Sequence, residues 1–339
     1  MPKLNVLIAG STGYIGIQLI KLLIKHNNVN IKYLCGNSSV GKNIYHYEKS
    51  FNLSKLPKIV KFHKSFLKKI DLIFTALPNG EAQKIARQIP KNIKLIDLSG
   101  DFRLNNHNVY KKYYKIKHNC KSLIKKSIYS ITEFSRKELP NYNIISCPGC
   151  YPTSVQLPLI PLIKKKLINI NRIVIDSKSG YSGAGRKIEK KLKDKIFLRS
   201  ISAYAVGNHR HTPEINQELS KIYNQKINVN FTPHIIPVSR GILSTIYLDV
   251  AKNYNAKKIY MFLKNYHKKN IFVKISKFNT SIGTSNVLHT NICKISVCKG
   301  SEKNKIIILS AIDNLIKGAS GQAVQNMNVA YGLKENLGL

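Results

Sequence analysis

The chain has 339 residues, 43% of them hydrophobic, and 56 basic against 16 acidic side chains give it a formal net charge of +40. This composition excludes a disordered chain, and the length predicts two domains rather than one core. The charge suggests nucleic-acid binding, but only eight of the 56 basic residues are arginines, and the 48 lysines are scattered among Asn and Ile. Because nucleic-acid readers favour arginine, we expect no nucleic-acid function and an anionic small-molecule substrate.

The chain shows no signal for a membrane or for secretion. Its apolar runs break at prolines or lysines well short of the roughly 20 residues of a membrane span, and MPKLNVLIAGSTG is a poor secretion signal. We therefore predict no membrane association and a cytoplasmic location, where six cysteines argue against a disulfide framework. Cys293 and Cys298 lie in an alternating, strand-like stretch and face opposite sides of it, so we expect no metal site shared with Cys147 and Cys150.

The first predicted elements form a nucleotide-binding pattern. The apolar run LNVLIAG is followed by STGYIG and by a segment with helical spacing, which places Gly10, Gly13 and Gly16 between a strand and a helix. Glycine lets the backbone approach a pyrophosphate, whose charge a helix N-terminus favours. The alternative is a tight turn without a ligand.

The next predicted strand, NIKYLCG, ends where an NAD-dependent enzyme would place an acidic residue on the ribose. Residues 36–39, Gly-Asn-Ser-Ser, occupy that place here, Lys42 follows, and the first carboxylate is Glu48. Hydroxyls and a lysine suit a 2′-phosphate, which favours NADP(H), with ordinary turn residues as the alternative. IDLIFTALPNGEAQKIA and NIKLIDLSGDF repeat the strand–turn pattern, so we expect a parallel sheet with ligands at the turns 77–80 and 99–101.

The segment SCPGCYPTS holds a redox pair, half a zinc site or a single nucleophile. Pro148 and Gly149 force a turn and helical spacing resumes after it, so Cys150 is expected at a helix start. A helix N-terminus and a neighbouring imidazolium both lower a thiol pKa, whereas Cys147 precedes the turn and lacks that benefit. A thioredoxin-like pair has its first cysteine at the helix start, so the pattern favours Cys150 as a nucleophile; two buried cysteines in a turn are the alternative.

A cysteine nucleophile needs an acid or base, and YAVGNHRHTPEINQEL offers His209, Arg210 and His211 at a helix entrance. Thr212 is expected to cap that helix and Pro213 to occupy its first turn. Most other histidines lie in lysine-rich contexts typical of solvated surface.

Three further features are less specific. The glycine-rich stretch KSGYSGAGRKIEKK suits a phosphate or carboxylate, and a plain glycine-rich turn is the alternative. Arg103 and Arg240 suggest tasks that lysine cannot perform, because arginine is rare in this chain. INRIVIDS, residues 170–177, is interpreted as solvated surface.

Eight segments in order resemble the N-acetyl-gamma-glutamyl-phosphate reductase family in its longer bacterial and plant form, and the resemblance covers residues 4–332. They are GSTGYIG, ALPNGEA, DLSGDFRL, PGCYPTS, SGYSGAGR, HRHTPEI, TPHIIPVSRGILSTIY and DNLIKGASGQAVQNMN. The resemblance implies an α/β chain with a doubly wound, Rossmann-like parallel-sheet domain, residues 1–149 and 313–339, whose C-terminal helix returns to it. It implies an α+β substrate and dimerisation domain over residues 150–312.

The implied activity is NADPH-dependent reductive dephosphorylation of an acyl phosphate, N-acetyl-L-glutamyl 5-phosphate, through a cysteine thioester, the third step of arginine biosynthesis. A homodimer or homotetramer is implied as well. The nearest alternative is another acyl-phosphate reductase such as aspartate-semialdehyde dehydrogenase, which shares the fold and the cysteine. A basic nucleic-acid-binding protein with a vestigial nucleotide domain is the alternative from another class.

Carried over by position, the resemblance implies Cys150 as the nucleophile and His209 as its acid or base, without separating His209 from His211. The implied substrate-binding residues are Ser179, Arg186, Arg103, His211 and Glu214. The implied cofactor-binding residues are Gly10, Thr12, Gly13, Tyr14, Ile15, Gly16, Ser38, Ser39, Pro78, Gln322 and Asn326. The sequence departs from the family at Gly100, where alanine is usual, and at YSITEF, where the family more often shows YGLPE.

Overall fold

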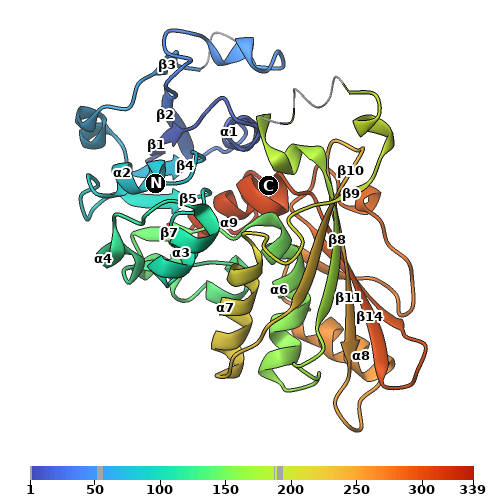
Figure 1. Ribbon diagram of the computed structural model, residues 1–339. Coiled ribbons are helices and arrows are strands. Elements are labelled where there is room, and N and C mark those ends of the chain that lie inside the picture. The colour runs from blue at the N-terminus through green and yellow to red at the C-terminus, as the bar shows by residue number, and fades with distance from the viewer. Residues whose placement is uncertain (1, 52–55, 187, 189–193) are drawn as a thin grey trace. The chain divides into compact units, whose positions relative to one another are not determined.

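The computed structural model describes residues 2–51, 56–186, 188 and 194–339 (Figure 1). The chain divides into two units: Met1–Pro148 together with Ala319–Leu339 form the first unit, and Gly149–Gly318 form the second unit. Each unit contains one seven-stranded sheet.

The first sheet is parallel at every strand pair, in the order β3-β2-β1-β4-β5-β7-β6. The order reverses direction at the neighbours β1 and β4, which is the position where doubly wound sheets bind ligands. The predicted doubly wound parallel sheet is therefore confirmed. The strands are β1 (Leu4–Ala9), β2 (Val29–Cys35), β3 (Ile59–Val60), β4 (Leu72–Thr75), β5 (Lys94–Asp97), β6 (Ser127–Tyr129) and β7 (Ile144–Ser146).

Both faces of the first sheet are buried, which explains why β1 is apolar throughout. Val6 and Ile8 join one hydrophobic cluster, while Leu7 and Ala9 on the opposite face join another. The C-terminal helix α9 (Gly321–Ala330), red in Figure 1, packs on α1 and β5. The other helices of this unit are α1 (Tyr14–Leu23), α2 (Glu81–Ala86), α3 (His107–Tyr114), α4 (Lys121–Ile124), α5 (Thr132–Ser135) and the 3₁₀ turns η1 (Ile44–His46), η3 (Lys64–Lys69) and η4 (Leu139–Asn141).

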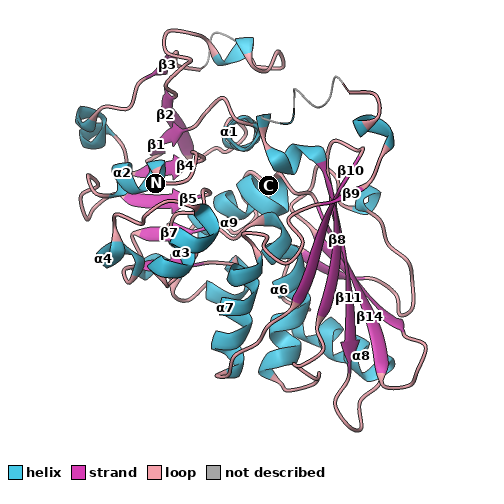
Figure 2. Ribbon diagram, viewed as in Figure 1, coloured by secondary structure: helices cyan, strands magenta, loops and turns pink. Residues whose placement is uncertain are grey.

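The second sheet mixes parallel and antiparallel pairs in the order β12-β13-β14-β11-β8-β10-β9 (Figure 2). The surface interpretation of residues 170–177 is wrong, because β8 contributes fully buried Ile175 and Ser177 to this sheet. The strands are β8 (Val174–Gly180), β9 (Ser202–Ala203), β10 (Asn230–Ile236), β11 (Ile242–Asp249), β12 (Val273–Ile275), β13 (Cys293–Lys299) and β14 (Lys305–Ile312). Short 3₁₀ turns are η5 (Tyr181–Ala184), η7 (Phe197–Arg199) and η8 (Thr284–Asn286), and η9 (Ile316–Ser320) is a π-helix.

Helix α6 (Cys150–Lys164) is the central helix of the second unit. It packs on β11, β13 and β14 and on the helices α7 (Thr212–Tyr223) and α8 (Ala256–Tyr266). Pro161 within α6 cannot donate to the carbonyl of Leu157, and the buried His267 ring contacts that carbonyl through Nε2 at 3.2 Å. The Nδ1 atom of His267 contacts the Asn270 amide at 2.9 Å, so this buried histidine serves the structure of α6.

Candidate active site

Cys150 is the first residue of α6, as the sequence predicts, and it is half-buried. Gly149 precedes it in the N-cap position without a side-chain cap hydrogen bond, and the first turn holds no acidic residue. The dipole of this 15-residue helix therefore favours a negative charge at the thiol.

Cys147 has the opposite environment. It is fully buried in the first unit just after β7, and its Sγ accepts a contact from the Asn326 amide at 3.6 Å. Burial raises the pKa of the Cys147 thiol to about 12, so it stays protonated at neutral pH. All six cysteines are free thiols, and of the two in SCPGCYPTS only Cys150 has the environment of a nucleophile.

Glu214 holds the turn in front of Cys150. Its fully buried carboxylate accepts the Gly149 N–H at 2.7 Å, so that amide is committed to Glu214. The His211 ring packs on the same glycine, where an added Cβ would lie 2.4 Å from its Nε2. His211 is the N-cap of α7 and Thr212 its first residue, so the expected Thr212 cap is wrong; Pro213 lies in the first turn as expected.

His209 is enclosed by aromatic rings. Only 6% of its surface is exposed, and four rings meet it edge-on from three segments of the chain. The centroid distances are 4.8 Å to His211, 5.4 Å to Tyr204, 5.5 Å to Phe231 and 5.6 Å to Tyr151. This enclosure holds the imidazole in one orientation and leaves only a small part of it exposed.

The protonation state of His209 follows from that enclosure. Burial, with a smaller contribution from the Arg210 charge, lowers its pKa to about 4, so the ring is neutral at neutral pH. Its Nδ1 accepts the backbone N–H of His211 at 3.1 Å, so the single proton of the neutral ring resides on Nε2. His209 is thus a hydrogen-bond donor, and the expectation that an imidazolium at this position lowers the thiol pKa is wrong.

Tyr151 and Tyr204 line the same region with their hydroxyls 3.1 Å apart. Tyr151 donates to the His234 carbonyl at 3.3 Å. Burial raises the pKa of Tyr204 to about 12 and that of Tyr151 further, and the charge of Cys150 adds to both shifts. Both phenols therefore remain protonated hydrogen-bond donors, and a negative charge on Cys150 raises the pKa of each.

A cavity of about 570 Å³ opens beside His209. None of the described residues that line it is acidic, so an anionic substrate meets no like charge and a free ammonium group finds no carboxylate. Arg186 is half-buried and is not among the lining residues. The polar lining includes Ser179, Tyr204, His209 and Arg210, and the apolar lining includes Ile188, Phe197 and Ile235.

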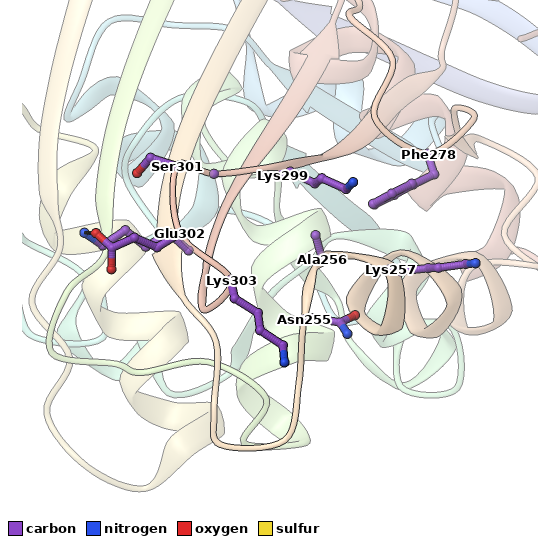
Figure 3. A pocket seen from close by; sticks show the side chains of 10 residues that line it. Asn255, Ala256, Lys257, Phe278, Lys299, Ser301, Glu302 and Lys303 are labelled. Carbon is purple, nitrogen blue, oxygen red and sulfur yellow. Dashed lines mark hydrogen bonds and ion pairs between the residues drawn. The ribbon is translucent and has the colours of Figure 1, made fainter.

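A second cavity of about 500 Å³ lies in the same unit (Figure 3). Four lysines, Phe278 and the start of α8 line it, and Lys305 pairs with Glu302 at 2.6 Å. Lys305 begins β14, whereas Cys150 and the first cavity lie by its far end at Ile312. This cavity is therefore separate from the candidate active site.

In the first unit, the predicted pyrophosphate turn is tightly closed. Gly10 has φ +87°, and a Cβ there would lie 2.2 Å from the Ala76 carbonyl oxygen. A Cβ on Gly16 would lie 2.2 Å from the Gly10 oxygen. Helix α1 starts after Gly13 with no side-chain cap and no acidic residue in its first turn, which fits an anion at its N-terminus. Thr12, Tyr14 and Ile15 are half-buried around this turn.

The residues after β2 fit a 2′-phosphate. Ser38 and Lys42 are exposed, whereas Ser39 is buried. The Glu48 carboxylate is bound to Lys21 at 2.7 Å, so it does not take the ribose position. Pro78 is exposed in the turn between β4 and α2.

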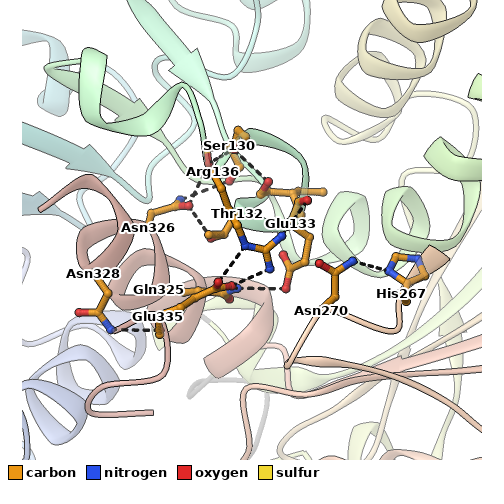
Figure 4. Close-up of polar contacts among 12 residues, drawn as sticks. Ser130, Thr132, Glu133, Arg136, His267, Asn270, Gln325, Asn326, Asn328 and Glu335 are labelled. Atoms are coloured by element: carbon orange, nitrogen blue, oxygen red, sulfur yellow. Dashed lines mark hydrogen bonds and ion pairs between the residues drawn. The ribbon is translucent and has the colours of Figure 1, made fainter. Parts of the chain in front are cut away.

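Asn326 belongs to a buried polar network, shown in Figure 4, and the buried Gln322 contacts Thr132 of the same network. The Asn326 oxygen accepts from Ser130 at 2.9 Å and from Thr132 at 2.6 Å, which ties α9 to the loop after β6. The Gln322 amide nitrogen donates to Thr132, and its oxygen, within the described part of the chain, has no hydrogen-bond partner. Gln322 thus keeps an acceptor for a ligand, whereas the Asn326 oxygen is occupied by the protein.

Arg103 contacts the backbone of its own unit. Its guanidinium donates to the carbonyl oxygens of Cys147 at 2.9 Å and Leu98 at 3.1 Å, which joins two strand ends. Nearby Gly100 has a local reason for replacing alanine: an added Cβ would lie 2.4 Å from the Tyr114 ring.

Two features of the site carried no usable sequence signal. Tyr151, Tyr204 and Phe231 form the enclosure of His209 from three separate segments, and single tyrosines are common in this chain. The role of Asp313 after β14 depends on a contact with Arg240, which lies 73 residues away. Among the described residues, no group of three or more His, Cys, Asp or Glu could hold a metal ion, and no helix is long and apolar enough to span a membrane.

Both units match known family models. Residues 5–142 match the model described as semialdehyde dehydrogenase, NAD binding domain, and residues 150–314 match the semialdehyde dehydrogenase dimerisation domain. The matches and the cysteine-centred site define a semialdehyde dehydrogenase with a dinucleotide-binding unit. Solved structures agree on the fold: aspartate semialdehyde dehydrogenase II from Vibrio cholerae has a TM-score of 0.73 at 18% identity, with 98% of this chain and 99% of that chain covered. The Candida albicans enzyme, solved with NADP, has a TM-score of 0.70 at 15% identity, with 99% of both chains covered.

Relatives at higher identity narrow the assignment. A Thermoanaerobacter pseudethanolicus protein named N-acetyl-gamma-glutamyl-phosphate reductase is 44% identical, with 98% of this chain and 96% of its own covered. A Brachyspira hyodysenteriae protein of the same name is 42% identical over 99% and 98% of the two chains. A rice protein named as the probable chloroplastic enzyme is 38% identical over 99% of this chain and 81% of its own. The chain therefore belongs to the N-acetyl-gamma-glutamyl-phosphate reductase family.

Proposed function

We propose that this protein reduces N-acetyl-L-glutamyl 5-phosphate to N-acetyl-L-glutamate 5-semialdehyde and phosphate, with NADPH as reductant, as the third step of arginine biosynthesis. The observation that carries the proposal is Cys150 at an uncapped helix start, followed by Tyr151, whose ring lies 5.6 Å from that of the enclosed His209, in a chain 42–44% identical to full-length relatives of that name. The neighbours at 14–18% identity share the fold only, so the aspartyl substrate has weaker support.

The chemistry begins at the Cys150 thiolate, which attacks the acyl carbonyl of the substrate. The tetrahedral oxyanion collapses, the bond to phosphate breaks with its electron pair, and a thioester on Cys150 remains. NADPH, when bound, supplies the hydride that converts the thioester into a hemithioacetal oxyanion. That oxyanion re-forms a carbonyl and expels the Cys150 thiolate with the aldehyde product.

His209 stabilises the oxyanions as a neutral donor through Nε2–H. A neutral imidazole with a lowered pKa polarises a carbonyl without first losing a proton to it, as in triosephosphate isomerase. Glu214 fixes Gly149 in front of the nucleophile, and Ser179 and Arg210 are positioned to bind polar groups of the substrate in the cavity. Arg186, His211 and Arg103 stay candidates for substrate contact.

The first unit supplies the residues that would hold NADP(H). The turn from Gly10 to Gly16 and the α1 N-terminus suit the pyrophosphate, and Ser38 with Lys42 suits the 2′-phosphate. The Gln322 amide oxygen is a buried acceptor suited to an amide N–H of the nicotinamide.

We further propose a homodimer or homotetramer in the cytoplasm. The dimerisation-domain match and the strongly exposed Ile196, Ile201 and Val206 support self-association, and six free thiols suit a reducing compartment. Light scattering during size-exclusion chromatography measures the molar mass of the assembly and so the number of its subunits.

The test of function is NADP⁺ reduction by N-acetylglutamate semialdehyde plus phosphate, with NAD⁺ and with aspartate semialdehyde as controls. Cys150→Ser should lower turnover by about 10³-fold or more while NADPH still binds, because a hydroxyl is a far weaker nucleophile. Cys147→Ser is the matched control and should stay within about threefold of wild type, because its thiol is buried and protonated. Loss of turnover in Cys147→Ser alone, or preference for aspartate semialdehyde, would contradict the proposal.

A further inference from the structure

The turn after β14 is built around the carboxylate of Asp313, which is fully buried. One oxygen, Oδ1, accepts the backbone N–H groups of Leu315 at 2.9 Å and Ile316 at 3.1 Å. The Asp313 carbonyl accepts the N–H of Gly318 at 3.0 Å. One residue thus sets the path of the chain from the end of β14 into η9, a rare π-helical turn of the kind often found at functional sites.

This turn presses directly on the nucleophile. A Cβ on Gly318 would lie 2.8 Å from the Cβ of Cys150 and 3.2 Å from its Cα. The backbone of Gly318 therefore occupies the space beside the first residue of α6, and a shift of the turn must change the surroundings of the thiol.

The second oxygen of Asp313 is held from another loop. Its Oδ2 accepts from Arg240 Nη1 at 3.2 Å and from the His289 N–H at 2.9 Å. The Arg240 side chain is 18% exposed, so a nearly buried guanidinium neutralises a buried carboxylate. This contact explains why arginine, which occurs only eight times in the chain, stands at position 240, because a guanidinium stays charged when buried.

The next residue joins the same turn to the substrate side of the site. The Asn314 amide oxygen accepts the Gly241 N–H at 2.8 Å, and its nitrogen donates to Ser182 at 2.9 Å. Gly241 in turn accepts the Gly180 N–H at 2.9 Å. Gly180 and its neighbour Ser179 line the 570 Å³ cavity, so the turn bridges the cavity wall and the nucleophile.

We propose that Asp313, held by Arg240, is a positioning residue. It fixes the position of Cys150 relative to residues 179–184, the substrate loop. The proposal rests on the proposed function for its kinetic test. A misplacement of about 1 Å in a reacting group can lower turnover by about 10²-fold, so loss of the contacts that fix the position of Cys150 should measurably lower the rate. Neither residue is expected to touch the reacting atoms.

The kinetic experiment compares Asp313→Asn, Arg240→Met and the conservative Arg240→Lys in the full-length enzyme. We expect kcat to fall about 10- to 100-fold in the first two variants with KM changed less than about threefold, and Arg240→Lys to recover part of the loss. Alkylation of Cys150 by iodoacetamide needs no alignment with substrate, so its rate should change less than kcat does. The matched control is Arg172→Met, because Arg172 is 77% exposed and 3.9 Å from Asp249 in the same unit; it should leave kcat unchanged.

A second measurement does not depend on activity. Amide hydrogen exchange in the first turn of α6 and in 180–184 should become about tenfold faster in Asp313→Asn and Arg240→Lys but not in Arg172→Met. Wild-type kcat and wild-type exchange in folded variants would overturn the positioning role. A wild-type enzyme without turnover would overturn the proposed function alone, and exchange would still decide the role of Asp313. If Asp313→Asn fails to fold, Arg240→Lys decides by the same two measurements.

Discussion

Lowering the pH from 7.5 to 4.5 should destabilise the second unit through His209. The ordinary pKa of histidine is 6.5, and burial lowers that of folded His209 to about 4. As the pH falls, the unfolded chain therefore binds this proton first, which favours unfolding. The stability is fully present above pH 6.5 and is lost progressively between pH 6.5 and 4.

The size of the effect follows from the two pKa values. Linkage gives a loss of about 1 kcal/mol at pH 5.5 and about 2–3 kcal/mol at pH 4.5, and almost none at pH 7.5. His209 is only 6% exposed, so solvent screening does not reduce these figures appreciably.

The assay is equilibrium urea unfolding of the wild type and of His209→Gln at pH 7.5, 5.5 and 4.5. Other titrating groups act in both proteins, so the difference between them isolates His209. The wild type should lose about 2–3 kcal/mol more than His209→Gln between pH 7.5 and 4.5. An equal loss in both proteins would refute the buried, neutral state of His209, as would an imidazole NMR titration with a midpoint near 6.5. The same spectra should show the proton on Nε2 at pH 7.

Two glycine predictions test close contacts in the two units. Gly16→Ala places a Cβ 2.2 Å from the Gly10 oxygen, so it should lower stability by about 2 kcal/mol and weaken NADPH binding. The stability of Gly13→Ala should change little, because its Cβ lies 3.6 Å from that oxygen. Thermal melting measures the stability and NADPH fluorescence the binding, and equal stability of the two variants would contradict the close contact at Gly16. Gly149→Ala places a Cβ 2.4 Å from the His211 ring and should lower kcat about tenfold with NADPH affinity unchanged; an unaltered kcat would show that this contact does not position Cys150.

Much of the fold could be predicted from the sequence, because hydrophobic periodicity and glycine turns are local signals. The run LNVLIAG predicted a strand before the glycine turn, and β1 is that strand, with both of its faces buried. β8 was missed because Asp176 and Lys178 alternate with buried serines, so the inward face shows a small polar residue where a hydrophobic one is expected. Ser177 is buried because its hydroxyl contacts the hydroxyl of Ser244 on β11 at 2.7 Å, a partner that lies 67 residues away.

The site was legible in part for the same reason. The position of Cys150 at a helix start is a local property of PGCYPTS, and it separated Cys150 from Cys147 before any contact was known. The charge state of His209 could not be predicted from the sequence, because it depends on aromatic rings from three segments of the chain. It also depends on the direction of one backbone N–H. An imidazolium was the natural expectation from the motif, and only burial reverses it.

A neutral His209 agrees with the proton balance of the proposed reaction. Cys150 enters the cycle as a thiolate and is expelled as a thiolate, so no base is required between turnovers. The one proton consumed ends on the released phosphate, which water can protonate after it leaves. The histidine therefore needs only to donate a hydrogen bond to each oxyanion. A pKa of about 4 keeps its ring neutral around pH 7, so it remains a donor and carries no charge that would pair with the thiolate.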